Sequence, residues 1–181
     1  SDIEGLKDEQ GNALYPTIAD VFGKESELGK NVIIAGGSEA GVETAMYLAE
    51  NGHDVTVLTR QDELAKDASH LHSVTTVHMR VLEDGLAHLI PQWEAYDNIR
   101  GILEVTTKKV DGNTVTYADK DGAWHTISGD SIVICGGTSP RLKEALEYSG
   151  CAPQFMVIGD ADSAGKLWRC SRQAYSAAYM L

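Results

Sequence analysis

A run of small residues in the first third of the chain has the composition of a phosphate-binding turn. It reads Gly36, Gly37, Ser38, Glu39, Ala40 and Gly41, between an apolar segment and a helical pattern. Gly36 allows a tight turn, and Gly41 allows the following helix to approach the preceding strand closely. The N–H groups of this turn would lie at the positive end of that helix, where a diphosphate binds. The pattern therefore predicts a dinucleotide site, although Ser38 stands where G-x-G-x-x-G has its middle glycine.

The end of the next apolar strand indicates which dinucleotide fits. An acidic residue there would accept hydrogen bonds from the adenine ribose and favour NAD or FAD. This chain has Thr59 followed by Arg60. Because Arg60 has the geometry to pair with a 2′-phosphate, the sequence favours NADP(H) over NAD(H) and argues against FAD at this turn.

Two strands and a helix must position these residues. Residues 31–35 form a short, continuously apolar run, as expected for a strand buried on both faces. Residues 39–51 have helical spacing with Val42, Ala45, Met46 and Ala49 on one face, and Gly52 ends the helix. A second strand over 54–59 completes a parallel β-α-β unit.

The rest of the chain predicts further elements of an α/β fold. We expect a Rossmann-like parallel sheet with helices on its faces, plus an antiparallel three-strand meander over about 101–127, with turns at 111–112 and 121–122. The predicted meander strands are 102–105, 113–117 and 124–127, and buried strands are expected over 131–135 and 155–158. Helices are predicted over 17–22 with Thr17 as N-cap, over 77–89 before Pro91, over 140–148, and over 164–181.

Composition excludes several function classes. The chain has 181 residues and a net charge of −12, and its scattered Lys and Arg argue against a nucleic-acid partner. No apolar run is long enough to span a membrane, and no signal-peptide pattern begins the chain. Cys135, Cys151 and Cys170 form no C-x-x-C pair, and His70, His72 and His78 lack completing ligands, so no metal site or disulfide is expected. These features predict three buried or inert thiols and a cytoplasmic protein.

Four stretches together resemble the two-dinucleotide-domain flavoproteins. They are residues 27–32, the helix 41–49, the strand and Gly/Pro exit 129–140, and Val157-Ile158-Gly159-Asp160. The similarity is to the C-terminal part of the NADH:flavin oxidoreductase group, which includes 2,4-dienoyl-CoA reductase, 2-enoate reductase and trimethylamine dehydrogenase. The resemblance implies that Gly159 and Asp160 belong to a flavin-domain motif. It also implies that Gly136 and Gly137 let the cofactor pass close to the backbone.

The resemblance also implies a division of labour within a longer enzyme. Residues 1–30 would be a lead-in, 31–150 the NAD(P)-binding domain, and 151–181 the return segment of an FAD domain. FAD, FMN and an iron–sulfur cluster would belong to the full-length parent, whose FAD and FMN-barrel domains would be this chain's partners.

The expected function is to position nicotinamide for hydride transfer to FAD. No acid–base constellation is visible, so we nominate no catalytic residue and expect the isolated chain to be inactive. The main alternative is a non-catalytic ADP-binding module, as in the trimethylamine dehydrogenase branch. Further alternatives are a self-contained Rossmann dehydrogenase with its own substrate site and a purely structural or interaction domain, and a homo-oligomer is compatible with the sequence.

Overall fold

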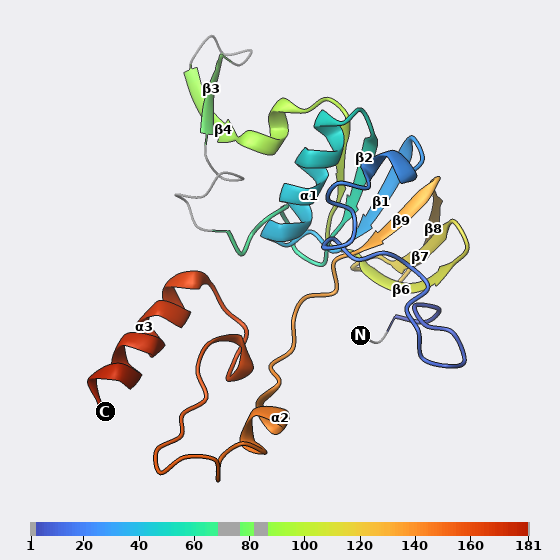
Figure 1. The fold of residues 1–181 in the computed structure, drawn as a ribbon. Helices are drawn as coiled ribbons and strands as arrows, with labels where there is room; N and C mark the ends of the chain where they lie inside the picture. Colours follow the sequence, from blue (N-terminus) through green and yellow to red (C-terminus); the bar gives the residue numbers. More distant parts are fainter. Residues whose placement is uncertain (1–2, 69–76, 82–86, 181) are drawn as a thin grey trace. The chain divides into compact units, whose positions relative to one another are not determined.

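The computed structural model describes residues 3–68, 77–81 and 87–180, with only the backbone given for 77–81 and 87–90 (Figure 1). The chain divides into two compact units, Ser1–Gly136 and Gly137–Leu181. The first unit contains the predicted phosphate-binding turn.

A four-stranded parallel sheet forms the centre of the first unit. Its strands are β1 (Asn31–Ala35), β2 (Asp54–Leu58), β5 (Ile99–Ile102) and β9 (Ser131–Ile134), in the order β5-β2-β1-β9. All three pairings are parallel, and Ile33 of β1 lies opposite Thr56 on one side and Ile132 on the other. This arrangement explains why β1 is apolar and buried from Val32 to Ala35, because neighbouring strands and packed layers enclose these residues.

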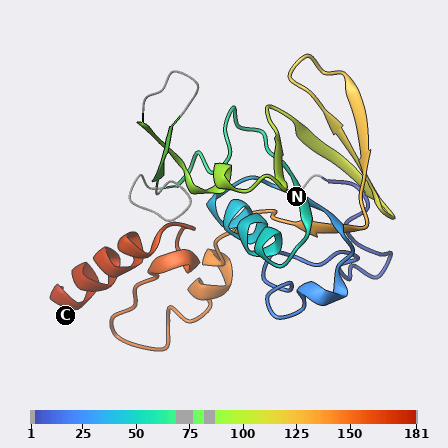
Figure 2. The same ribbon diagram turned by 90° about the horizontal axis from the view of Figure 1, so that it is seen from above.

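One helix covers one face of the sheet. α1 (Glu39–Glu50) packs on β1 and β2, and its buried face includes Val42, Ala45, Leu48 and Ala49. These side chains meet those of alternate strand positions, such as Val32, Ile34, Val55 and Val57. Figure 2 shows α1 lying along the sheet. The predicted β-α-β unit is confirmed to within one residue at the ends of α1 and β2.

A three-stranded antiparallel meander packs on the opposite face of β1 and β9. It consists of β6 (Thr106–Asp111), β7 (Thr114–Ala118) and β8 (Trp124–Ser128). Val110 and Val115 share a second apolar cluster with Ile33, Ile132 and Ile134. The Rossmann-like α/β class with an antiparallel meander is thus confirmed. The first meander strand was predicted four residues too early, because Ile102 pairs with Leu58 and ends β5 instead.

The segment predicted as a helix over 77–89 contains two strands. β3 (Val77–Val81) and β4 (Ala87–Pro91) pair antiparallel, and the 3₁₀ helix η2 (Gln92–Ala95) follows. Apolar residues at 77, 79 and 81 alternate with polar ones, so the four-residue spacing of Val77 and Val81 suits a strand as well as a helix. Leu82 and Leu86, like His70 and His72, lie outside the described residues.

The helix predicted after Thr17 is also wrong. Residues 17–23 form turns, and the Asp20 carboxylate accepts hydrogen bonds from the amide (2.8 Å) and hydroxyl (2.6 Å) of Thr17. The backbone bonds here are isolated turns, from the Asp20 amide to Thr17 and from the Lys24 amide to Val21, and Gly23 is left-handed with φ of +76°, so no helix continues. The lead-in segment instead includes the 3₁₀ helix η1 (Glu25–Glu27) and joins the sheet through a bridge between Thr17 and Ile134.

The second unit is mostly helical and irregular. It holds α2 (Leu142–Leu146), the 3₁₀ helix η3 (Gly159–Ala161) and α3 (Leu167–Tyr179), so both predicted helices are shorter than expected. Residues 155–158 form no strand, contrary to prediction, because no strand among the described residues pairs with them. None of the helices in the described part has the length and apolar character needed to cross a bilayer.

Candidate functional site

The strand order places the glycine-rich turn at a topological switch point. From β1 the chain continues to β2 on one side, whereas β9 flanks β1 on the other. In open α/β sheets, ligands bind in the crevice outside the carboxyl ends of the strands at such a point. Gly36 follows β1 and Cys135 follows β9, and the Cys135 amide donates to the Ala35 carbonyl at 3.0 Å. The predicted turn therefore lies where this fold binds ligands.

The three glycines of the turn are required by close packing within the protein. Gly36 has φ of +128°, and a Cβ atom there would lie 2.2 Å from the Cys135 carbonyl oxygen. A Cβ on Gly37 would lie 2.7 Å from Cβ of Thr59. At Gly41 the added atom would lie 2.2 Å from the Gly36 carbonyl oxygen. Gly41 thus sets how closely α1 approaches β1, as the sequence predicted.

The first amides of α1 lack the usual cap. Ser38 is the N-cap residue, but its side chain makes no capping hydrogen bond. Its hydroxyl instead lies 3.3 Å from the Cys135 thiol. A serine at this position ordinarily accepts from the second or third helical amide, here Ala40 or Gly41. Within the described part of the chain, neither of these amides donates to an acceptor, which leaves two N–H groups for an anion.

The loop after β2 folds back over the turn. The Ala65 amide donates to the Gly37 carbonyl at 2.9 Å, and the Asp67 carboxylate accepts from the Glu39 amide at 2.8 Å. Leu64 and Ala65 are buried, and Leu64 belongs to the same core cluster as α1. The backbone of Ala65 is left-handed, with φ of +54°. These contacts fix a carboxylate against the first amide of α1.

Thr59 and Arg60 differ in their surroundings. Thr59 is buried, its amide donates to Ile102, and its hydroxyl accepts from the Gln61 amide at 3.2 Å. This side chain therefore packs against the turn and starts the loop. Arg60 is exposed, and no ion pair holds its guanidinium within the residues that the structure describes.

The remaining predicted residues are Gly136, Gly137, Gly159 and Asp160. Gly136 is exposed, and a Cβ there would meet only Ile134 at 3.7 Å, while Gly137 has φ of +74° and open space around it. Gly159 and Asp160 belong to the second unit. There, the Gly159 amide donates to the Gln173 side chain at 2.8 Å, and Asp160 accepts from the Gly165 amide at 3.2 Å.

Sequence reasoning missed three residues that shape the turn. Cys135 was considered only as a thiol, whereas it lies beside Ser38. Of the three cysteines expected to be buried or inert, Cys135 and Cys170 are half-buried and Cys151 is exposed. Leu64 and Asp67 were not singled out. The apolar pair Leu64-Ala65 inside a polar loop was the available signal that this loop packs down, but the partner of Asp67 had no local signature.

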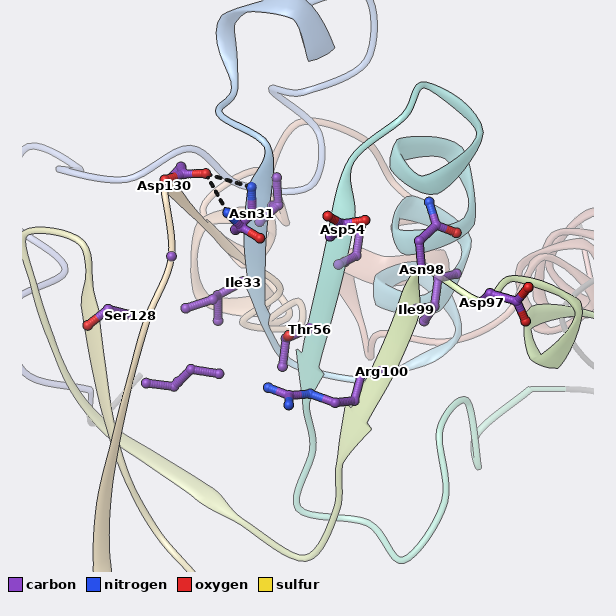
Figure 3. Close-up of a pocket in the computed structure, with 14 residues that line it drawn as sticks. Asn31, Ile33, Asp54, Thr56, Asp97, Asn98, Ile99, Arg100, Ser128 and Asp130 are labelled. Atoms are coloured by element: carbon purple, nitrogen blue, oxygen red, sulfur yellow. Dashed lines mark hydrogen bonds between the residues drawn. The ribbon is translucent and has the colours of Figure 1, made fainter.

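A separate groove lies at the opposite, amino-terminal end of the sheet (Figure 3). Thr56 of β2 and Arg100 of β5 line it together with Ile127 and Ser128 of the meander. Asp130 at its edge accepts from the backbone amide (2.7 Å) and side-chain amide (2.9 Å) of Asn31. In open α/β sheets ligands bind outside the carboxyl ends of the parallel strands, whereas this groove lies at their amino ends.

Comparison with known proteins gives the same family as the resemblance. The family model described as pyridine nucleotide-disulphide oxidoreductase matches residues 18–152. Curated relatives include a metal reductase of Desulforamulus reducens, 27% identical across 88% of this chain. A bilirubin reductase of Mediterraneibacter gnavus is 30% identical across 83% of this chain. The chain spans only 26% and 21% of the length of these relatives.

Solved structures agree on the fold. A 2-naphthoyl-CoA reductase superimposes with a TM-score of 0.69 at 22% identity, covering 98% of this chain and 24% of the other. Histamine dehydrogenase from Rhizobium sp. 4-9 gives 0.67 at 15% identity, covering 98% and 28%. The switch-point turn, the sheet order and a family match over three quarters of the sequence lead to one conclusion: this chain belongs to the pyridine nucleotide-disulphide oxidoreductase family.

Proposed function

We propose that this chain is the NAD(P)H-binding domain of a multi-domain flavin-dependent oxidoreductase. The observation that carries the proposal is the pair of uncapped amides at Ala40 and Gly41, placed at the switch point of a parallel sheet. A dinucleotide diphosphate has the charge and the acceptor oxygens to satisfy both amides. The glycines around them allow the helix to pack closely against the strand ends.

The residues present fit a nicotinamide dinucleotide. Diphosphate would lie on the amides of Ala40 and Gly41, and the ribose would lie near Thr59 and Arg60. Nicotinamide would extend past Gly136 and Gly137. A bound nicotinamide supplies hydride, which FAD would accept in the full enzyme; the chain's own part is to bind and orient.

The domain organisation belongs to the same proposal. Residues 1–30 would lead in, residues 31–150 would bind the dinucleotide, and residues 151–181 would complete an FAD domain supplied by the rest of a longer polypeptide. Gly159 and Asp160 would then contact FAD, and FMN and an iron–sulfur cluster would belong to further parts of that polypeptide. Support comes from the names of relatives such as an NADH oxidase, of which the chain spans 22%.

Arg60 makes NADP(H) the proposed dinucleotide. Its exposed guanidinium follows the end of β2, where no carboxylate stands to repel a 2′-phosphate. Arg60→Gln should weaken NADPH binding about tenfold and leave NADH binding unchanged, since only NADPH carries the extra phosphate. Arg100→Gln is the matched control, because it removes an equally exposed arginine from the groove at the other end of the sheet.

Titration calorimetry with ADP, NADH and NADPH tests the whole proposal. Binding of all three, with NADPH tightest, supports a nicotinamide-binding domain. Equal affinity for the three would instead favour the ADP-binding module considered above. Absence of binding to any of them would refute a nucleotide site at this turn.

A further inference from the structure

The Asp67 carboxylate lies at the amino-terminal end of α1, where a phosphate would also bind. Its Oδ1 atom lies 2.8 Å from the amide nitrogen of Glu39, the first residue of α1. The next two amides in the chain, those of Ala40 and Gly41, are the ones left uncapped. Any anion on those two amides must therefore lie close to the negative charge of Asp67.

The loop holds this carboxylate in place from several sides. Ala65 is tied to the Gly37 carbonyl at 2.9 Å, and Ala68 closes a turn onto Ala65 at 2.8 Å. Leu64 is 5% exposed and anchors the loop in the core of the unit. These two backbone hydrogen bonds and the buried Leu64 side chain hold the loop on both sides of Asp67. The contact of Asp67 with α1 is therefore part of the fold.

From this geometry we infer that Asp67 sets the affinity of the site by competing with the dinucleotide's diphosphate for the N-terminus of α1. The inference rests on the proposed function and adds a residue that governs how tightly the diphosphate is held. The diphosphate on the amides of Ala40 and Gly41 would lie beside the carboxylate on the Glu39 amide, and like charges at one helix terminus repel each other. Bound diphosphate would displace Asp67 from Glu39 and loosen the loop over 61–68.

Charge removal with the acceptor retained is the direct test. Asp67→Asn keeps an oxygen that accepts from the Glu39 amide, so the loop stays folded, but it loses the negative charge. ADP should bind about tenfold more tightly to this variant at low ionic strength, and the gain should shrink as salt screens the repulsion. Adenosine, which has no phosphate, should bind both proteins equally.

Asp62→Asn provides the matched control. It removes the same charge from the same loop, where Asp62 only pairs with Lys66 at an exposed position. Its affinity for ADP should stay at the wild-type value. Asp67→Ala serves as a second variant, and its thermal unfolding shows whether losing the acceptor disturbs the fold.

The outcomes distinguish a failure of the role inferred for Asp67 from a failure of the proposed function. Wild-type protein that binds ADP, together with unchanged or weaker binding by Asp67→Asn, would overturn the role of Asp67 alone. Wild-type protein that binds neither ADP nor NADPH, with an Asp67→Asn variant that is equally inert, would overturn the proposed function. Equal gains for ADP and adenosine would also overturn the inference, since they would indicate a change in the loop rather than in charge.

Discussion

The contact between Gly41 and Gly36 makes Gly41→Ala the sharpest test of the site's architecture. A Cβ atom at position 41 would lie 2.2 Å from the Gly36 carbonyl oxygen, whereas ordinary contacts begin near 3.4 Å. The position of the Cβ atom is fixed by the backbone of residue 41 and the oxygen belongs to the backbone of Gly36, so no side-chain rotation relieves the contact. α1 would have to move by about 1 Å from the end of β1 to accommodate the methyl group.

Gly41→Ala changes the free energy of unfolding through two contributions of opposite sign, helix propensity and overpacking. Alanine in a helix is favoured over glycine by about 1 kcal/mol. Overpacking against a fixed neighbour costs roughly 1–3 kcal/mol, and a backbone clash lies at or above the upper end of that range. We therefore expect the free energy of unfolding to fall by about 2 kcal/mol. The shift of the first amides should also weaken ADP binding more than tenfold, or about 1.4 kcal/mol.

Urea denaturation followed by circular dichroism measures the free energy of unfolding, and titration calorimetry measures the affinity for ADP. Gly136→Ala is the control for stability, because the added methyl group meets only Ile134 at an ordinary 3.7 Å. An unfolding free energy for Gly41→Ala equal to or above that of the wild type would refute the packing argument. Unchanged ADP affinity in a destabilised variant would show that the turn does not carry the ligand.

Three further predictions concern the frame around the site. Leu48→Ala should cost about 3 kcal/mol in urea denaturation, because Leu48 is fully buried between α1 and the sheet; a cost below 1 kcal/mol would contradict this packing. The hydrogen bond from Tyr96 to Glu50 raises the pKa of the Tyr96 hydroxyl to about 12, so its stabilising contribution is complete below pH 10 and is lost as pH rises through about 12. Ultraviolet titration should show a late-ionising tyrosine that disappears in Tyr96→Phe, and an unchanged titration curve at high pH would count against that bond. The amides of Asn31 lower the pKa of the Asp130 carboxyl below 3.8, so its contribution is present above that value and is lost as pH falls through the lowered pKa. Acid unfolding of Asp130→Asn should consequently depend less steeply on pH than that of the wild type, and equal slopes would show that the bond does not persist in solution.

Local sequence determined the β-α-β unit and the glycine-rich turn. The short β-branched run at 32–34, followed by Gly36-Gly37, indicates a strand, and the three-to-four-residue spacing from Val42 to Ala49 indicates a helix. Where a pattern suited two structures, as at Val77 and Val81, prediction failed. The strand predicted over 155–158 is wrong for another reason. A strand forms only when a neighbouring strand pairs with it, and the local sequence does not show whether such a neighbour is present.

The candidate site likewise has features that the local sequence predicts and features that only the tertiary structure creates. Position in the chain identified Gly36 and Gly41, since a turn between a strand and a helix imposes its own glycines. Tertiary structure alone turned the Ser38 hydroxyl toward Cys135 and brought Asp67 to the Glu39 amide. These contacts join residues 97 and 28 positions apart, so they depend on strand order and loop packing, which no local pattern encodes.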